Sequence, residues 1–201
     1  MASWPTNPEL IGKSIRRIDG PDKTQGKAKY TYDLTRPGML YGRILRSPHA
    51  HARVVSIDLS EAQKAPGVKA VLALIDLQNP EPLTHKVLFA GQDVAAVAAE
   101  TEEQAGDAVR LIKVQYEVLP HVATVEQARR PEAPKILPAG NMRQGNVDET
   151  GDVETALKNS AHVVEAAYAT QVVTHTSLET HGSICEWDGD KLTVWASTQG
   201  V

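Results

Sequence analysis

The stretch Asp93-Val-Ala-Ala-Val-Ala-Ala-Glu-Thr101, followed by Glu102-Glu-Gln-Ala-Gly-Asp-Ala-Val-Arg-Leu-Ile-Lys-Val114, decides the fold of the larger part of this chain. Apart from Asp93, its first seven residues are small and apolar, which predicts a central strand over Asp93–Ala99 that a helix approaches closely. Thr101 with Gln104 three residues later is a capping-box pattern and predicts the start of that helix. The chain then returns as a strand over Val114–Val118.

The residues upstream predict more strands and one short helix. We expect strands over Met39–Arg46, Ala52–Asp58 and Val68–Ile75, the last of them buried because its apolar run is nearly continuous. Ser60 is a good N-cap for a helix that ends before Pro66-Gly67. Two strand–helix–strand units therefore predict a compact α/β domain over residues 39–120, preceded by an extended arm over residues 1–38.

Downstream, the pattern changes from a domain to a linker and then to isolated β elements. Residues 121–150 are rich in proline and lack periodicity, which predicts a linker, and Asp152–Asn159 fits one or two helical turns. Ala161–Val173 is the longest strand candidate. Two alternating runs, Ser183–Trp187 and Lys191–Ala196, flank an Asp-Gly turn and predict a hairpin.

An isolated hairpin is only marginally stable in water, and its open edges invite pairing with another chain. We therefore expect residues 151–201 to be an incomplete, β-rich portion of a second domain that another polypeptide completes. The fold class is then α+β or α/β, with one compact domain followed by this partial one.

The composition excludes several classes of protein. The net charge of −4, with both signs interspersed, does not suggest binding to nucleic acid or to an anionic membrane surface. The chain shows neither the pattern of a signal peptide nor a run of about 20 apolar residues, so we expect a cytoplasmic protein. Its one cysteine, Cys185, can form neither an internal disulfide nor an iron–sulfur cluster.

The candidate chemical residues are few. His175, Glu179 and His181 could ligate a metal, but their spacing is irregular, and a hydrogen-bonded turn is the favoured interpretation. His49 and His51 could likewise be ligands or a base, and a polar turn at the entry of a strand is favoured. Cys185 occupies an alternating strand position, where we expect a buried and inert thiol. These residues alone name no reaction.

Several motifs, in order, resemble one known family. Arg17–Lys23, Met39–Arg53 and Gly91–Thr101, together with Gly26–Tyr30 and Ala65–Val68, resemble the opening and the "hammerhead" domain of the molybdenum-binding large subunits of the xanthine dehydrogenase and aldehyde oxidase family. Beyond the linker, residues 178–181 and 197–201 resemble the first strands of that family's molybdenum-cofactor domain.

The resemblance implies an oxidation of aldehydes or N-heterocycles with water as the oxygen source. It places Gln199 beside the molybdenum centre as the catalytic candidate, and Gln199 with Gly200 as the cofactor-binding candidates, with no metal ligand. The molybdenum–pterin cofactor would be shared with a companion chain that supplies the rest of its domain and the general base. Iron–sulfur clusters and FAD would lie on partner subunits, and aldehydes are favoured over purines as substrate.

On this interpretation the chain is the N-terminal fragment or subunit of a split molybdenum hydroxylase, inactive by itself. Two alternatives stay open. The chain could be a non-catalytic scaffold of the same complex, or a truncation of a longer polypeptide.

Overall fold

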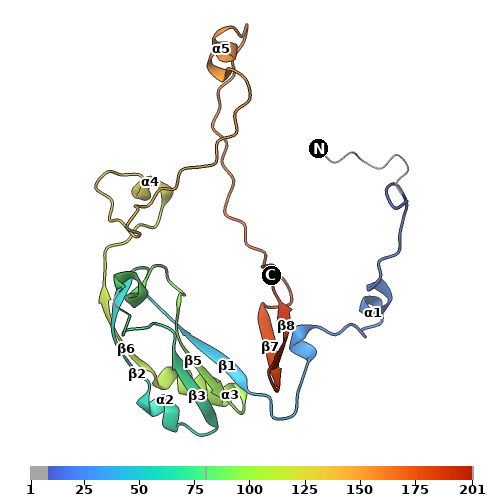
Figure 1. Cartoon of the computed structure of the whole chain (residues 1–201), viewed down its shortest axis with the longest axis vertical. Coiled ribbons are helices and arrows are strands. Elements are labelled where there is room, and N and C mark those ends of the chain that lie inside the picture. Colours follow the sequence, from blue (N-terminus) through green and yellow to red (C-terminus); the bar gives the residue numbers. More distant parts are fainter. Residues whose placement is uncertain (1–8, 80, 201) are drawn as a thin grey trace. The chain divides into compact units, whose positions relative to one another are not determined.

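Two units make up the chain in a computed structural model that describes residues 9–79 and 81–200 (Figure 1). The first unit joins Met1–Arg36 to Ala167–Val201, and the second is Pro37–Ala166. This division does not test the domain boundaries expected from the sequence, and those boundaries stay predictions. In the described part of the chain, no helix combines the length and the apolar character that a membrane crossing requires.

The second unit contains a three-stranded antiparallel sheet in the order β1-β5-β3. Its strands are β1 (Tyr41–Arg46), β5 (Asp93–Ala99) and β3 (Val68–Ala73). In one cross-strand row, Ala96 of β5 lies between Ile44 of β1 and Leu72 of β3. The prediction that residues 93–99 form a central strand is confirmed.

Two helices, α2 (Ser60–Lys64) and α3 (Glu102–Leu111), pack on one face of this sheet. The buried side chains between them are small or medium in size: Ala62, Ala95, Val97, Ala108 and Ile112. Small side chains on β5 let α3 approach closely, because alanine adds little bulk between the two backbones. The predicted close approach of a helix to this strand is confirmed.

The capping box at the start of α3 is also confirmed. Thr101 Oγ1 accepts the Gln104 backbone N–H at 3.2 Å, and Gln104 Oε1 accepts the Thr101 backbone N–H at 3.1 Å.

The N-cap expected for α2 is wrong by one residue. Leu59 is the N-cap, and Ser60 begins the helix with its N–H donated to Asp58 Oδ1 at 3.0 Å.

A second antiparallel sheet has the order β4-β2-β6, with β2 (Ala52–Asp58) at its centre. Its edges are β4 (Lys86–Val87) and β6 (Lys113–Val118). This sheet contributes to a second buried cluster, made of Ala52, Val54, Ile75, Val87 and Val94. The two-residue strand β4 was not predicted, because a run that short carries no periodicity.

The expectation of a buried strand over residues 68–75 is wrong. Leu72 is 61% exposed, because it points away from α2 and α3, to a part of the other face of the sheet that is not covered. All strand pairs in both sheets are antiparallel. The mixed α and β content expected from the sequence is therefore arranged in antiparallel sheets.

Short elements complete the second unit. They are η2 (Pro82–His85), α4 (Val125–Ala128) and α5 (Val153–Lys158). The helical turns predicted over Asp152–Asn159 are confirmed as α5, which begins where Asp152 Oδ1 accepts the Thr155 N–H at 2.9 Å.

The first unit holds α1 (Gly20–Thr24), η1 (Thr31–Asp33) and a hairpin of β7 (Gly182–Asp188) and β8 (Lys191–Ser197). The predicted hairpin is confirmed. Its turn places Gly189 at a φ of +57°, a conformation that glycine adopts without steric cost.

The strand predicted over Ala161–Val173 is wrong for this chain. Residues 162–177 contain no helix or strand. A strand is defined by hydrogen bonds to a neighbouring strand, and none of the strands described in the structure pairs with this segment. The residue pattern therefore indicates a β character that the described structure does not show as a strand.

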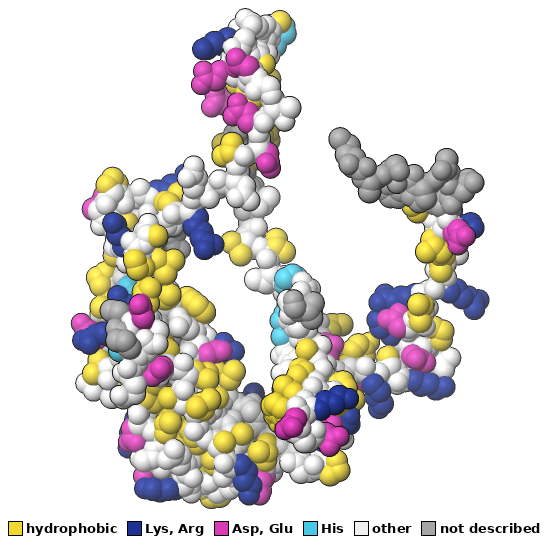
Figure 2. Space-filling model, in the orientation of Figure 1, with side chains coloured by type: hydrophobic (Ala, Val, Ile, Leu, Met, Phe, Trp, Pro, Cys, Tyr) yellow, Lys and Arg dark blue, Asp and Glu magenta, His cyan; other side chains and the backbone are white. Residues whose placement is uncertain are grey.

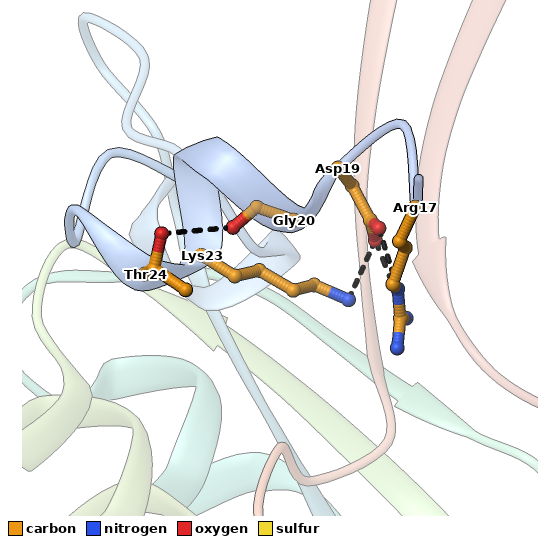
Figure 3. Close-up of polar contacts among 5 residues, drawn as sticks. All are labelled: Arg17, Asp19, Gly20, Lys23 and Thr24. Carbon is orange, nitrogen blue, oxygen red and sulfur yellow. Dashed lines mark hydrogen bonds and ion pairs between the residues drawn. The ribbon is translucent and has the colours of Figure 1, made fainter. Parts of the chain in front are cut away.

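Three charged side chains meet beside α1, in the first of the family-like motifs (Figure 3). Asp19 receives the Arg17 Nε–H at 2.5 Å and pairs with Lys23 Nζ at 2.6 Å. Hydrogen bonds from Lys23 and then Arg17 lower the Asp19 pKa to about 2. Thr24 Oγ1 donates to Gly20 O at 3.1 Å. These groups are exposed, so the pairs order the turn locally and contribute little to global stability.

We predict that Gly67→Ala destabilises the second unit. Gly67 has a φ of +76°, and a Cβ built there would clash with Gln104 Oε1, the atom that caps α3. The strained backbone and the displaced cap should together lower the free energy of unfolding by about 1–3 kcal/mol, measured by urea denaturation.

Gly38→Ala is the matched control for this prediction, because Gly38 has a φ of +70° and no other group lies within 4 Å of the position that a Cβ would take there. It should show the backbone cost alone. A double-mutant cycle with Gln104→Ala isolates the clash. If Gly67→Ala lowers the free energy of unfolding by the same amount in the wild-type and the Gln104→Ala backgrounds, the role assigned to the cap is contradicted.

Candidate cofactor-contact site

The predicted cofactor-contact residues follow directly on β8. Gly200 N donates to Thr198 Oγ1 at 3.2 Å, and the same hydroxyl lies 3.2 Å from Gly200 O. This local turn holds the backbone on both sides of Gln199. Both Gln199 and Gly200 are exposed, so the Gln199 carboxamide is accessible to a ligand. The cofactor roles of the two residues stay predictions, and Val201 lies outside the described residues.

The N-terminal arm packs on one face of the hairpin that carries this site. Arg36 Nε donates to Glu186 Oε2 at 3.1 Å, and its guanidinium lies 4.7 Å from the centroid of the Trp195 ring. Nearby in sequence, the Thr31 backbone N–H donates to Glu179 Oε1 at 3.0 Å. A cation over an aromatic face is attracted by the ring quadrupole. Sequence reasoning missed these contacts, because they join residues about 150 positions apart.

The opposite face of the hairpin is uncovered in the described chain. Cross-strand register places Cys185 beside Val194 and Trp187 beside Leu192 on this face. Trp187 is 68% exposed, and hydrophobic side chains gather over the hairpin in Figure 2. Cys185 is also exposed, so the expectation of a buried thiol is wrong. Cys185 lies in a strand as expected, but no other part of its unit covers the face of the hairpin to which its side chain points.

The segment around His175, Glu179 and His181 forms hydrogen bonds of a structural kind. Glu179 accepts from Thr31 as described, and the Ser177 hydroxyl donates to Glu179 O at 2.9 Å. Within the described residues, no three histidine, cysteine, aspartate or glutamate side chains come close enough to hold a metal ion.

The turn Ser47–His51 in the second unit is held by several hydrogen bonds. The His49 backbone N–H donates to Ser47 Oγ at 3.1 Å. His51 is buried, and its Nδ1 lies 2.7 Å from Pro120 O. Because a carbonyl can only accept, Nδ1 carries the hydrogen. Leu119 N donates in turn to His51 O at 2.9 Å. These contacts tie the entry of β2 to the end of β6 and agree with the favoured interpretation of a polar turn.

Tyr116 of β6 lies against this turn. The His49 ring meets the Tyr116 ring edge-on, with centroids 4.9 Å apart. Burial raises the pKa of the Tyr116 hydroxyl, and a hydrogen bond with Ser47 opposes that shift. The hydroxyl therefore stays protonated to a higher pH than that of a free tyrosine.

We predict that stability conferred by Tyr116 is lost in alkali. A raised pKa in the folded state means that the folded state binds the proton more tightly than the unfolded state. The contribution of the Tyr116 hydroxyl to the free energy of unfolding is therefore full below a pH of about 10, and it falls as the pH rises through the folded-state pKa. Absorbance titration at the tyrosinate band should show one late-titrating tyrosine.

Tyr116→Phe should remove the late step in this titration. Tyr168→Phe is the control, because Tyr168 is exposed and its removal should leave the late step in place. A late step that survives Tyr116→Phe would contradict the assignment.

Two family descriptions match the chain in succession. Residues 25–120 match "Aldehyde oxidase and xanthine dehydrogenase, a/b hammerhead domain", and residues 138–201 match "Molybdopterin cofactor-binding domain".

The helix α4 lies between these two ranges. It was missed from the sequence, although Thr124 with Gln127 repeats the capping-box signal that located α3.

Named relatives agree with these matches. The chain is 38% identical to a probable xanthine dehydrogenase subunit of Bacillus subtilis (strain 168), covering 94% of this chain and 27% of the relative. It is 35% identical to the nicotinate dehydrogenase large molybdopterin subunit of Eubacterium barkeri, covering 95% and 48%. The chain therefore spans between about a quarter and a half of the length of these relatives.

A solved structure shows the same fold. The crystal structure of quinoline 2-oxidoreductase from Pseudomonas putida 86 superposes with a TM-score of 0.75 at 31% identity, over 94% of this chain and 27% of that one. The class defined by the fold and the matches is that of molybdenum hydroxylase domains. The chain belongs to the xanthine dehydrogenase and aldehyde oxidase family, with a hammerhead domain followed by part of a molybdopterin cofactor-binding domain.

Proposed function

We propose that this chain is the N-terminal part of the molybdenum-binding component of a hydroxylase that oxidises aldehydes or N-heterocycles with water as the oxygen source. The observation that carries this proposal is Gln199. It is exposed immediately after β8, within the range that matches the molybdopterin cofactor-binding domain.

The groups at the end of β8 fit a cofactor contact. The Gln199 carboxamide offers two N–H donors and a carbonyl acceptor, and such a group would hydrogen-bond polar atoms at the edge of a bound cofactor. Gly200 has no side chain to obstruct the approach of a large ligand. When bound, a molybdenum–pterin cofactor supplies the oxygen-transfer and two-electron chemistry, and the protein supplies binding and orientation. Gln199 would hold and orient one edge of the cofactor.

The proposed hydroxylase needs further polypeptides. A single cysteine cannot hold an iron–sulfur cluster, so electrons would leave through iron–sulfur and FAD groups on partner subunits. The general base and the substrate pocket would lie on the part of the cofactor-binding domain that this chain does not contain. The isolated chain should therefore show no turnover.

A second candidate function is a non-catalytic scaffold in the same complex. One observation favours it. The face of the β1-β5-β3 sheet away from the helices exposes Ile44 and Leu72 on either side of Ala96. By contrast, the β4-β2-β6 sheet exposes a cross-strand ion pair between Arg53 and Glu117. An exposed apolar patch of this kind is a feature of assembly surfaces.

We predict that Gln199→Ala, in the complex reassembled with its partners, lowers kcat ten-fold or more. Loss of one charge-stabilising hydrogen bond costs about 1.5–3 kcal/mol, and about 1.4 kcal/mol corresponds to ten-fold. Gln144→Ala is the matched control, because Gln144 is an exposed glutamine outside any helix or strand.

Molybdenum content, measured by mass spectrometry of the metal, separates the two candidate functions further. An unchanged kcat with full molybdenum content would favour the scaffold over direct participation of Gln199. Turnover by this chain without partners would contradict the requirement for further polypeptides.

We also predict that the uncovered face of the hairpin packs against the companion polypeptide. Val194→Lys should reduce the yield of assembled complex at least ten-fold, because the lysine would bury an unpaired charge at an obligate interface of more than about 2,000 Å². Gln115→Lys, on the polar face of β6, should assemble normally.

Size-exclusion chromatography of co-expressed chains gives the yield of complex. Normal assembly of the Val194→Lys variant would contradict the prediction. A monodisperse, stably folded monomer of the wild-type chain would also count against it.

A further inference from the structure

One guanidinium group of the N-terminal arm contacts both strands of the hairpin. Arg36 Nε donates to Glu186 Oε2 of β7 at 3.1 Å, and the guanidinium lies 4.7 Å from the centroid of the Trp195 ring of β8. Its Nη1 also donates to the carbonyl oxygen of Thr35 at 3.2 Å, which holds the group against its own backbone. A planar guanidinium can lie over a ring and donate within its plane at the same time, whereas a lysine ammonium cannot.

A second contact holds the arm at the entry of β7. The Thr31 backbone N–H donates to Glu179 Oε1 at 3.0 Å, three residues before β7 begins. Between Thr31 and Arg36, the short helix η1 lies against both strands of the hairpin (Figure 1). The Tyr30 N–H, donated to Asp33 Oδ2 at 3.1 Å, orders η1 itself. The arm is therefore fixed to the hairpin at two points.

These contacts act on the strand that leads to Gln199. Trp195 lies opposite Ile184 in the cross-strand register, and both side chains are half-buried on the face that the arm covers. β8 ends at Ser197, two residues after Trp195 and two before Gln199. No described side chain of this unit is buried, so no hydrophobic core fixes the direction of β8. In the described chain, pairing with β7 and the contacts of the arm therefore hold this strand.

We propose that Arg36 is a positioning residue, which holds β8 in the direction that presents the Gln199 carboxamide to the bound cofactor. This inference rests on the proposed function. It also assigns the end of the arm to the cofactor-binding part of the protein. The family description counts residues 25–36 with the hammerhead domain, whereas the structure groups them with the hairpin.

Arg36→Gln tests the proposal in the complex reassembled with its partners. Glutamine stays polar but loses the charge over the Trp195 ring and the ion pair with Glu186. At full molybdenum content, this variant should lower kcat per bound molybdenum about three-fold or more, because a loosely held group spends less time in the productive geometry. Arg36→Lys keeps the charge without the planar group and should recover part of the loss.

Arg43→Gln is the matched control. Arg43 pairs with Glu102 in the second unit at a similar exposure, so the control loses an ion pair of the same kind away from the hairpin. Its kcat per bound molybdenum should equal that of the wild type. A fall in kcat as large as that of Arg36→Gln would overturn the inference.

A double-mutant cycle with Gln199→Ala tests whether Arg36 acts through Gln199. If it does, adding Arg36→Gln to Gln199→Ala lowers kcat no further. A second fall, of the same size as in the wild-type background, would overturn the inference, because Arg36 would then act by another route.

Hydrogen exchange gives a readout that does not depend on turnover. In the assembled Arg36→Gln complex, the amides of residues 193–200 should exchange about ten-fold faster or more, while those of β5 stay unchanged. A lower yield of complex, with wild-type exchange and wild-type kcat per bound molybdenum, would overturn the inference, because Arg36 would then serve assembly alone.

The same measurements separate this inference from the proposed function. If Gln199→Ala lowers kcat but Arg36→Gln does not, the positioning role is refuted and the proposed function stands. If Gln199→Ala leaves kcat unchanged at full molybdenum content, the direct participation of Gln199 is refuted, and the positioning role of Arg36 is overturned with it.

Discussion

The fold of the second unit depends on the packing of one strand, β5, on both of its faces. Ala95 and Val97 pack with α2 and α3 in one buried cluster, while Val94 belongs to the other cluster with residues of the β4-β2-β6 sheet. Because strand side chains alternate, a single run of small apolar residues serves two cores. The capping box at Thr101 and Gln104 then starts α3 at Glu102, with two residues between the strand and the helix. Gly67 lies against that cap, so the turn before β3 is tied to the same interaction.

Much of this unit could be predicted from sequence because its signals are local. A small apolar run, a capping box and the return of a strand lie within 26 consecutive residues, from Asp93 to Val118. What sequence could not give is the partner of each strand. The β1-β5-β3 order and its antiparallel register join segments that are far apart in sequence, and periodicity gives no information on pairing. The exposure of Leu72 has the same origin, since nothing in residues 68–75 says which face a helix will cover.

The candidate site could be located only in part. Residue patterns found the hairpin, and resemblance to a family singled out Gln199, whose cofactor role is still a prediction. The contact of Arg36 with Trp195 and Glu186 has no local signal, because each residue type is common alone. Cys185 shows the converse error. The alternating pattern placed it correctly in a strand, but burial requires a covering element, which the described chain does not contain on that face.

The two units differ most in burial, and this difference supports the proposed dependence on other polypeptides. Every buried hydrophobic residue of the described chain lies between Ala52 and Ile112, in the second unit. In the first unit, polar pairs at exposed or part-buried positions join the arm to the hairpin and to Glu179, and such pairs are individually weak. Hydrophobic burial is the dominant favourable term in folding, so polar pairs alone do not offset the conformational entropy of ordering about 70 residues. The arm covers one face of the hairpin, and the companion polypeptide that we propose would cover the other. The residues proposed to meet the cofactor therefore lie in the unit whose described residues include no buried hydrophobic side chain.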